Sequence, residues 1–189
     1  MSKSSIEEIE VKFTNINLDE IRQKLINAKA ELKTPKRLMR RSVFGSEANN
    51  SMKCTYGRVR DEGDVVTMSA KYSAVNGDIN SQKEVMITVD SYESGVMLLE
   101  AFGLIKTNSQ ENYRETWILN GVYVELEEWP LLSPYIEIEG ESVEDLIQVA
   151  KILDLNWNEH TTDSTDKLYK NEFSWDNQEL AQKISDLHF

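Results

Sequence analysis

Hydrophobic and charged residues alternate at the start of the chain, within Ile6–Phe13. A period of two predicts a β-strand whose two faces differ in character. One face of this strand carries Glu8, Glu10 and Lys12, and the other carries Ile9, Val11 and Phe13. The first strand therefore presents three charges on one side.

Helical spacing follows this strand and returns later in the chain. Asn17 precedes apolar residues spaced three and four apart, and Glu20 completes a capping box, so a first helix is predicted after Asn17. Further helices are predicted from Asp90 as a cap to a stop at Gly103, from Ser142 onward, over Asp166–Lys170 and over Asp176–Leu187.

Seven more segments have the composition and alternation of strands. They are Leu38–Phe44, Cys54–Asp61, Val65–Lys71, Gln82–Val89, Asn112–Leu119, Gly121–Trp129 and Tyr135–Glu139. The pair Asn120-Gly121 is a strong signal for a tight hairpin. Strand-rich halves with a helix beside each indicate the α+β class, and eight antiparallel strands with flanking helices can close a β-barrel around one small ligand.

Length and composition are those of one ordinary folded domain. The chain has 189 residues, of which 40% are hydrophobic and 29% are charged. We expect a single domain over 1–189, with the C-terminal helices, about 164–189, covering one end of the barrel. The only cysteine, Cys54, cannot form an internal disulfide, which favours a cytoplasmic location.

The formal net charge of −12 opposes attraction to nucleic acid and to anionic membranes. No apolar run is long enough to cross a bilayer. A small anion can still bind, because a pocket responds to its local charges more than to the total. We therefore expect a small-molecule partner, no nucleic acid and no membrane, with a homodimer left open.

Charged pairs on several strands carry the strongest chemical signal. Arg58 and Arg60 share one strand face, as do Glu125 and Glu127, and Glu137 and Glu139. A single such pair is most often a solvated surface. Together, with apolar residues on the opposite faces, they predict a barrel interior in which carboxylates hold a cation such as Mg²⁺, Mn²⁺ or Ca²⁺.

Positive side chains on the predicted strands suit a phosphate ligand. They are Lys12, Arg41, Arg58, Arg60, Lys71 and Arg114. A cation together with a wall of Arg and Lys is how proteins stabilise phosphoryl transfer, so the expected ligand is a polyphosphate. The sequence contains none of the common phosphate-loop, dinucleotide or zinc-protease motifs.

The opening Glu8-Ile9-Glu10-Val11-Lys12 resembles the Glu-X-Glu-X-Lys signature of the CYTH superfamily, also called triphosphate tunnel metalloenzymes. The likeness extends through Arg58-Val59-Arg60, Met68–Lys71, Lys83-Glu84, Arg114, Glu127 and Tyr135–Gly140. The chain departs from the family pattern at Glu127, where Asp is common, at Arg41 and Val43, where Asp and Tyr are common, and at Met86, where a second acid is frequent.

The resemblance implies an eight-stranded antiparallel tunnel and a divalent cofactor, Mg²⁺ or Mn²⁺. The implied metal ligands are Glu8, Glu10, Glu127, Glu137 and Glu139. The implied substrate-binding residues are Lys12, Arg41, Arg58, Arg60, Lys71, Glu84 and Arg114, and the implied catalytic residues are Glu8, Glu10 and Lys12.

Three functions follow from this resemblance. The first is a metal-dependent triphosphatase that acts on inorganic triphosphate, thiamine triphosphate or a nucleoside triphosphate. The second is an adenylate cyclase that converts ATP to cyclic AMP and pyrophosphate, which Glu139 disfavours because cyclase members often lack that acid. The third is a module that binds polyphosphate or nucleotide without catalysis, for which the loss of an acid at Met86 is the main argument.

Overall fold

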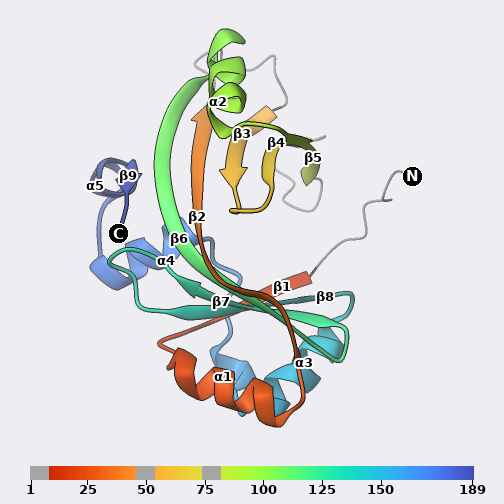
Figure 1. Cartoon of the computed structure of the whole chain (residues 1–189). Coiled ribbons are helices and arrows are strands. Elements are labelled where there is room, and N and C mark those ends of the chain that lie inside the picture. Colours follow the sequence, from red (N-terminus) through yellow and green to blue (C-terminus); the bar gives the residue numbers. More distant parts are fainter. Residues whose placement is uncertain (1–8, 46–53, 74–81) are drawn as a thin grey trace. The chain divides into compact units, whose positions relative to one another are not determined.

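The computed structural model describes residues 9–45, 54–73 and 82–189 of the chain (Figure 1). The chain divides into two compact units, which are described separately. The first comprises Met1–Arg37 and Asn112–Leu180, and the second comprises Leu38–Glu111 and Ala181–Phe189. The strands β2 (Glu31–Gly45) and β6 (Ile105–Leu119) have residues in both units. The single domain over 1–189 stays a prediction.

The first unit consists of an antiparallel sheet and short helices. Its strands lie in the order β1 (Ile9–Thr14), β8 (Tyr135–Gly140), β7 (Val122–Glu128) and β6. The helices are α1 (Leu18–Asn27), α3 (Val143–Ile152), the 3-10 turn η2 (Trp157–Glu159) and α4 (Thr165–Phe173), and α5 (Asn177–Ile184) begins in this unit. The predicted α+β class is confirmed.

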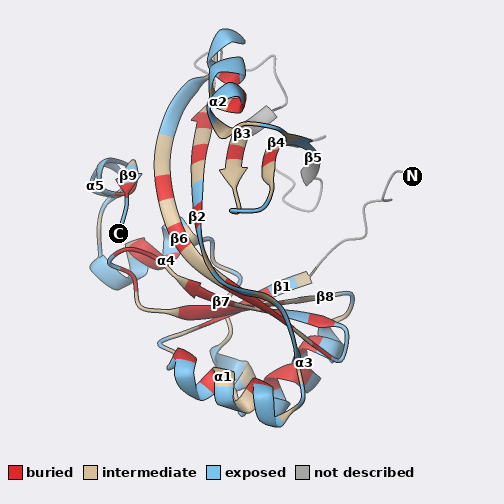
Figure 2. Ribbon diagram, viewed as in Figure 1, coloured by how far each residue is buried: buried red, intermediate tan, exposed pale blue. Residues whose placement is uncertain are grey.

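One face of this sheet forms the hydrophobic core. Val11 of β1 and Ile138 of β8 are partners in the register and are both buried. Figure 2 shows buried stretches along the neighbouring strand β7. Those two partners belong to one cluster with Leu25 of α1 and Leu146 of α3, so both helices cover the same face. The predicted apolar side of the first strand is therefore the core side, and its charged residues lie on the opposite face of the sheet.

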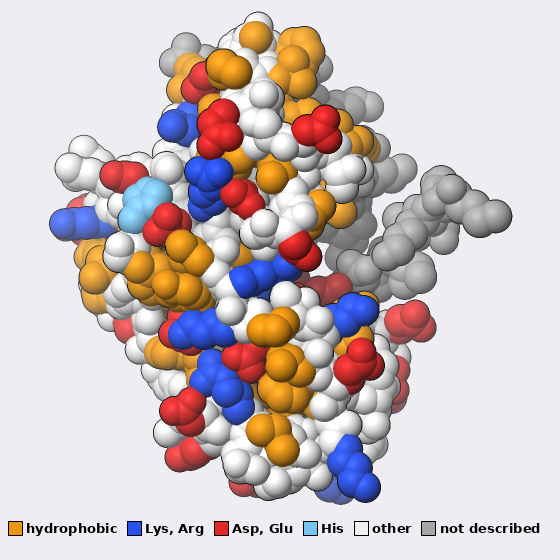
Figure 3. Space-filling model, viewed as in Figure 1, with side chains coloured by type: hydrophobic (Ala, Val, Ile, Leu, Met, Phe, Trp, Pro, Cys, Tyr) orange, Lys and Arg blue, Asp and Glu red, His pale blue; other side chains and the backbone are white. Residues whose placement is uncertain are grey.

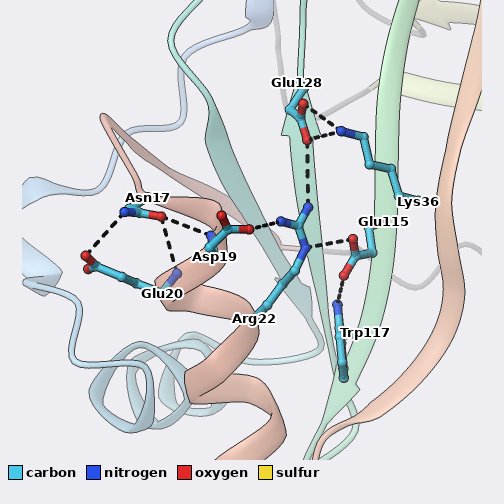
Figure 4. Close-up of polar contacts among 8 residues, drawn as sticks. All are labelled: Asn17, Asp19, Glu20, Arg22, Lys36, Glu115, Trp117 and Glu128. Atoms are coloured by element: carbon cyan, nitrogen blue, oxygen red, sulfur yellow. Dashed lines mark hydrogen bonds and ion pairs between the residues drawn. The ribbon is translucent and has the colours of Figure 1, made fainter.

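Polar contacts tie α1 to the sheet at the edge of this core (Figure 4). Arg22 Nε donates to Glu115 of β6 at 2.9 Å, and Trp117 Nε1 donates to the other oxygen of Glu115 at 2.7 Å. Glu115 is buried, so these two donors compensate for its lost hydration. At the start of the helix, the side chain of Asn17 accepts from the backbone N–H groups of Asp19 and Glu20, as the predicted cap requires.

The second unit repeats the arrangement of a helix on an antiparallel sheet. Here β6 is followed in order by β2, β3 (Cys54–Asp61), β4 (Val66–Ser73) and β5 (Gln82–Val89). Helix α2 (Tyr92–Ala101) packs on this sheet where Gly95 and Leu99 meet Val59 and Phe44. Its outer side is partly apolar and exposed, at Met97 among others, and Figure 3 shows hydrophobic side chains at this surface.

The cap of α2 differs from the prediction. Ser91, and not Asp90, is the N-cap, because its hydroxyl accepts from the backbone N–H of Ser94 at 3.2 Å. The predicted stop at Gly103 is borne out by its left-handed conformation, with φ of 81°. The hairpin at Asn120-Gly121 is likewise confirmed, since both residues have positive φ, at 54° and 85°.

The predicted element boundaries were wrong at three places. Strand β6 begins at Ile105 and β2 at Glu31, because their first halves are polar and lack a clear alternation. The last helix ends at Ile184, and Asp186–Leu187 forms the short strand β9, which pairs in parallel with β6. The buried side chain of Leu187 is therefore held by strand pairing and not by a helix.

The predicted closure into a barrel is not observed in the described strands. Their pairings form an open path from β1 to β5. On the outer edge of β1, Lys12 and Thr161 exchange two backbone hydrogen bonds, of 2.7 and 2.9 Å, so residue 161 takes the pairing position that a closing strand would use there. None of the helices in the described ranges is long and apolar enough to cross a membrane.

Leu25 tests the core of the first unit. Its side chain is fully buried in α1, whereas the neighbouring Ile26 is 55% exposed. We expect Leu25→Ala to lower the free energy of unfolding by about 2–5 kcal/mol, because it removes buried methyl groups and leaves a cavity. Ile26→Ala is the matched control and should change it by less than about 0.5 kcal/mol. If urea denaturation showed the same decrease in the free energy of unfolding for both variants, this packing would be contradicted.

Candidate functional site

The register of the first sheet aligns charged residues in rows across its polar face. Lys12 of β1 is the partner of Glu137 of β8, which is in turn the partner of Glu125 of β7. In the next row, Glu10 is the partner of Glu139. Partners on neighbouring strands point to the same side, so these charges converge on one surface. The predicted meeting of Glu10 and Lys12 with the late glutamate pair is observed.

Lys12 is the positive centre of this surface. Its side chain is only 4% exposed, and its Nζ lies 2.5 Å from Glu10 and 3.2 Å from Glu137. Burial by itself lowers the pKa of Lys12, but the attraction of Glu137 and Glu10 outweighs it, and the pKa is raised. Lys12 therefore stays charged at neutral pH and neutralises part of the carboxylate charge around it.

Three carboxylates lie close enough together to share a metal ion. Oxygen atoms of Glu10, Glu137 and Glu139 all lie within 4.8 Å of one another. An all-oxygen donor set at this spacing fits Mg²⁺ or Mn²⁺ and is unsuited to a thiolate-type zinc site. Glu10 is exposed and Glu137 is buried, so Glu10 is the ligand that can most easily change its rotamer. The residues present therefore fit the predicted cofactor.

Glu127 is placed differently from these three. Its side chain is wholly buried and accepts from Asn112 at 2.9 Å and from Trp129 Nε1 at 3.0 Å, both at one oxygen. The Nε of Arg114 donates to the other oxygen. Arg114 also forms an ion pair with Glu125. Glu127, predicted as a metal ligand, is therefore not among the carboxylates that gather around Lys12.

The same burial shapes the protonation of the neighbouring groups. It raises the pKa of Glu137, although Lys12 and Arg114 act in the opposite direction. It raises the pKa of Tyr135 well above its usual value, with further contributions from Glu127 and Glu137. For Arg114, burial lowers the pKa, but Glu127 and Glu125 outweigh it and the pKa is raised. Arg114 is therefore charged, and burial disfavours the charged form of Glu137.

Three of the predicted arginines, Arg41, Arg58 and Arg60, lie in the second unit. Arg41 of β2 is the partner of Arg60 of β3, and Val43 is the partner of Arg58, so the three arginines share one face of that sheet. Arg60 is 2.6 Å from Glu62. In the backbone register, Lys71 of β4 is the partner of Glu84 of β5. The side chains of Lys71 and Glu84 are not among those described, and Glu8 lies outside the described residues.

The sequence prediction did not include Glu125 among the site residues. It lies in the row of Lys12 and Glu137 and forms the ion pair with Arg114. The signal for it was present, because Glu125 and Glu127 share one face of a strand by simple alternation. The roles of Asn112 and Trp129 had no such signal, since their contacts with Glu127 join β6 and the end of β7.

Comparison with solved structures gives close fold similarity at low sequence identity. A candidate adenylate cyclase from Vibrio parahaemolyticus has a TM-score of 0.72 and 11% identity, with 86% of this chain and 97% of that chain covered. The PH1012 protein from Pyrococcus horikoshii has a TM-score of 0.67 and 20% identity, with 85% of this chain and 98% of that chain covered. A candidate adenylyl cyclase from Hippeastrum with a dominant triphosphatase activity has a TM-score of 0.56 and 16% identity, with 87% of this chain and 95% of that chain covered.

The chain has the CYTH-like fold. The resemblance carried by the opening strand, the arginine strand and the late glutamate pair is thereby confirmed at the level of the fold. No family model matches the chain, and no curated protein matches it in sequence. A CYTH-like fold alone does not fix an activity, so the function has to be argued from the side chains.

The pKa of Glu137 makes the stability of the metal-free protein depend on pH. Because this pKa is raised in the folded state, the folded chain binds more protons than the unfolded chain between the ordinary and the raised value. The stability from this group is present below the ordinary pKa and is lost as the pH rises through the raised one. With a chelator present, Glu137→Gln should therefore stabilise the protein at about pH 7 more than at about pH 4. A difference in Tm that is independent of pH would contradict this.

Proposed function

We propose that the chain is a divalent-metal-dependent triphosphatase. The observation that carries the proposal is the grouping of Glu10, Glu137 and Glu139 within 4.8 Å beside the buried Lys12. Arg114 lies on the same polar face, anchored by two carboxylates. A trio of carboxylates beside fixed positive charges suits a substrate that carries its own negative charge and is bound together with a cation.

The charge balance of this face explains why a cation is needed. Five carboxylates, those of Glu10, Glu125, Glu127, Glu137 and Glu139, face the two cations Lys12 and Arg114. A polyphosphate alone would be repelled by this surplus of negative charge. Divalent cations reverse the local sign and so make the surface attractive to phosphate oxygens.

In this proposal Glu10, Glu137 and Glu139 hold Mg²⁺ or Mn²⁺. The bound ion would neutralise phosphate oxygens and lower the pKa of the attacking water. Lys12 and Arg114 orient the phosphate chain and stabilise charge that develops on the leaving oxygen. Water forms the new P–O bond at the terminal phosphorus, the bond to the leaving pyrophosphate oxygen breaks, and Glu10 accepts the proton of the water. The roles that the resemblance implies for Glu8, Arg41, Arg58, Arg60, Lys71 and Glu84 stay predictions.

Substitution of the metal-binding glutamates tests the proposed activity. With Mg²⁺ or Mn²⁺ and inorganic triphosphate, Glu10→Gln and Glu139→Gln should each lower kcat/KM by at least about 100-fold, the scale that loss of one electrostatic contact has in active sites. Glu144→Gln, at an exposed position of α3, is the control and should keep full activity. Phosphate release that survives both substitutions would refute this site.

Binding without turnover provides a second test. Calorimetry of inorganic triphosphate should show binding in the presence of Mg²⁺ and none in the presence of a chelator, because the metal-free face repels the ligand. Raising the ionic strength should weaken the repulsion but should not restore specific binding. Equally tight binding with and without metal would contradict the charge argument.

Adenylate cyclase activity is the second candidate. It is favoured by the fold similarity to the Vibrio parahaemolyticus structure, which is a candidate adenylate cyclase. Both reactions use cations on a triphosphate and differ in the nucleophile, which is water in one and the ribose hydroxyl in the other. Incubation with ATP separates them, since cyclic AMP with pyrophosphate identifies a cyclase, whereas phosphate release identifies a triphosphatase.

A further inference from the structure

Glu127 and Arg114 form a buried pair whose geometry differs from that of the metal-binding trio. Glu127 is 0% exposed, and Arg114 is 20% exposed. The pair thus lies mostly in the protein interior, and only part of the Arg114 side chain is accessible to solvent. A buried carboxylate in this position is retained only if its charge is compensated by donors.

Both oxygens of Glu127 are engaged. Asn112 and Trp129 donate to one, at 2.9 and 3.0 Å, and Arg114 donates to the other. Ligand atoms of one Mg²⁺ or Mn²⁺ ion lie about 2.0–2.2 Å from it and therefore within a few ångströms of one another. The oxygens of Glu10, Glu137 and Glu139 meet that condition as a group, and among the described carboxylates Glu127 is not a member of it.

Arg114 retains donors for a ligand. A guanidinium has five N–H groups. Its Nε is directed to Glu127, and its Nη1 is directed to Glu125. The two carboxylates fix the plane of the guanidinium from both sides, which leaves further N–H groups of a preoriented fork for phosphate oxygens.

We infer that Glu127 is a positioning residue that orients Arg114 toward a phosphate group, and that it is not a ligand of the metal. This assignment rests on the proposed function, because it concerns how the same site holds its triphosphate. It predicts that metal affinity and triphosphate affinity respond separately to changes at this position. Trp129 and Asn112 act one step further away by fixing Glu127.

The experiment measures Mn²⁺ binding and the binding of inorganic triphosphate to the Mn²⁺-loaded protein. Glu127→Gln should leave Mn²⁺ affinity within about threefold of the unchanged protein and should weaken triphosphate binding by about 10–100-fold, as loss of a supporting partner commonly does. Glu10→Gln should instead lose Mn²⁺ binding. Glu128→Gln is the matched control, because Glu128 is the next residue and pairs with Arg22 and Lys36, and both affinities should stay unchanged.

A double-mutant cycle separates positioning from a general effect on the fold. If Glu127 acts through Arg114, Glu127→Gln should have little further effect on triphosphate binding in an Arg114→Met background. Additive effects of the two substitutions would refute the inference. Trp129→Phe removes one donor to Glu127 while keeping an aromatic side chain, and it should give a smaller loss of triphosphate binding with Mn²⁺ affinity unchanged. It therefore supplies the test if Glu127→Gln does not fold.

The two proposals fail in different ways. An unchanged protein that binds neither Mn²⁺ nor triphosphate would refute the proposed function. The other outcome is that the unsubstituted protein binds both Mn²⁺ and triphosphate, but Glu127→Gln loses Mn²⁺ binding as fully as Glu10→Gln does. That outcome would refute only the role assigned to Glu127.

Discussion

Charged side chains that are buried on one face of a sheet need compensating charges or hydrogen-bond donors, and this constraint organises the first unit. Lys12 is almost wholly buried, and it is kept charged by Glu10 and Glu137. On the same face, Glu127 is compensated by Arg114, Asn112 and Trp129. Glu137 and Arg114 lie on different strands from the groups that they compensate, so these two pairings depend on the register of the sheet. A slip of one residue in β1 would turn Lys12 into the core and Val11 out of it, so the core and the charged face are two results of one register.

The compensation is incomplete, and this is what makes the face suited to a ligand. Among the described residues named on this face the carboxylates outnumber the cations, and the raised pKa of Glu137 reflects the burial that disfavours its charged form. A proton, the ammonium group of Lys12 and a divalent cation therefore compete for the same oxygens. A site that is stabilised when a cation arrives binds that cation more tightly than an already balanced site would.

The sequence predicted best those elements whose pattern is local. The alternation in the first strand and in Tyr135–Gly140 identified both the core face and the polar face, and Asn120-Gly121 located the hairpin. The polar first half of β6 and the two-residue strand β9 depend on pairing with distant residues, so no local pattern marks them. For the same reason the sequence could not distinguish Glu127 from Glu125, since their partners are decided by which donors the neighbouring strand and Trp129 supply.

The matched structures have a similar fold but low sequence identity to this chain, so the requirements of the fold can be separated from those of the chemistry. Structures at 11% and 20% identity share this fold, so the fold does not depend on the identity of most individual side chains. The chemistry depends on the exact length of a few side chains. At residue 127, where the resembling family commonly has Asp, the glutamate has one more methylene group, and its carboxylate lies about 1.5 Å farther from the backbone. The carboxylate of Glu127 reaches Asn112 and Trp129 at 2.9 and 3.0 Å, and the shorter side chain of an aspartate would lie farther from both donors. At this position the glutamate contacts Arg114 as well as Asn112 and Trp129.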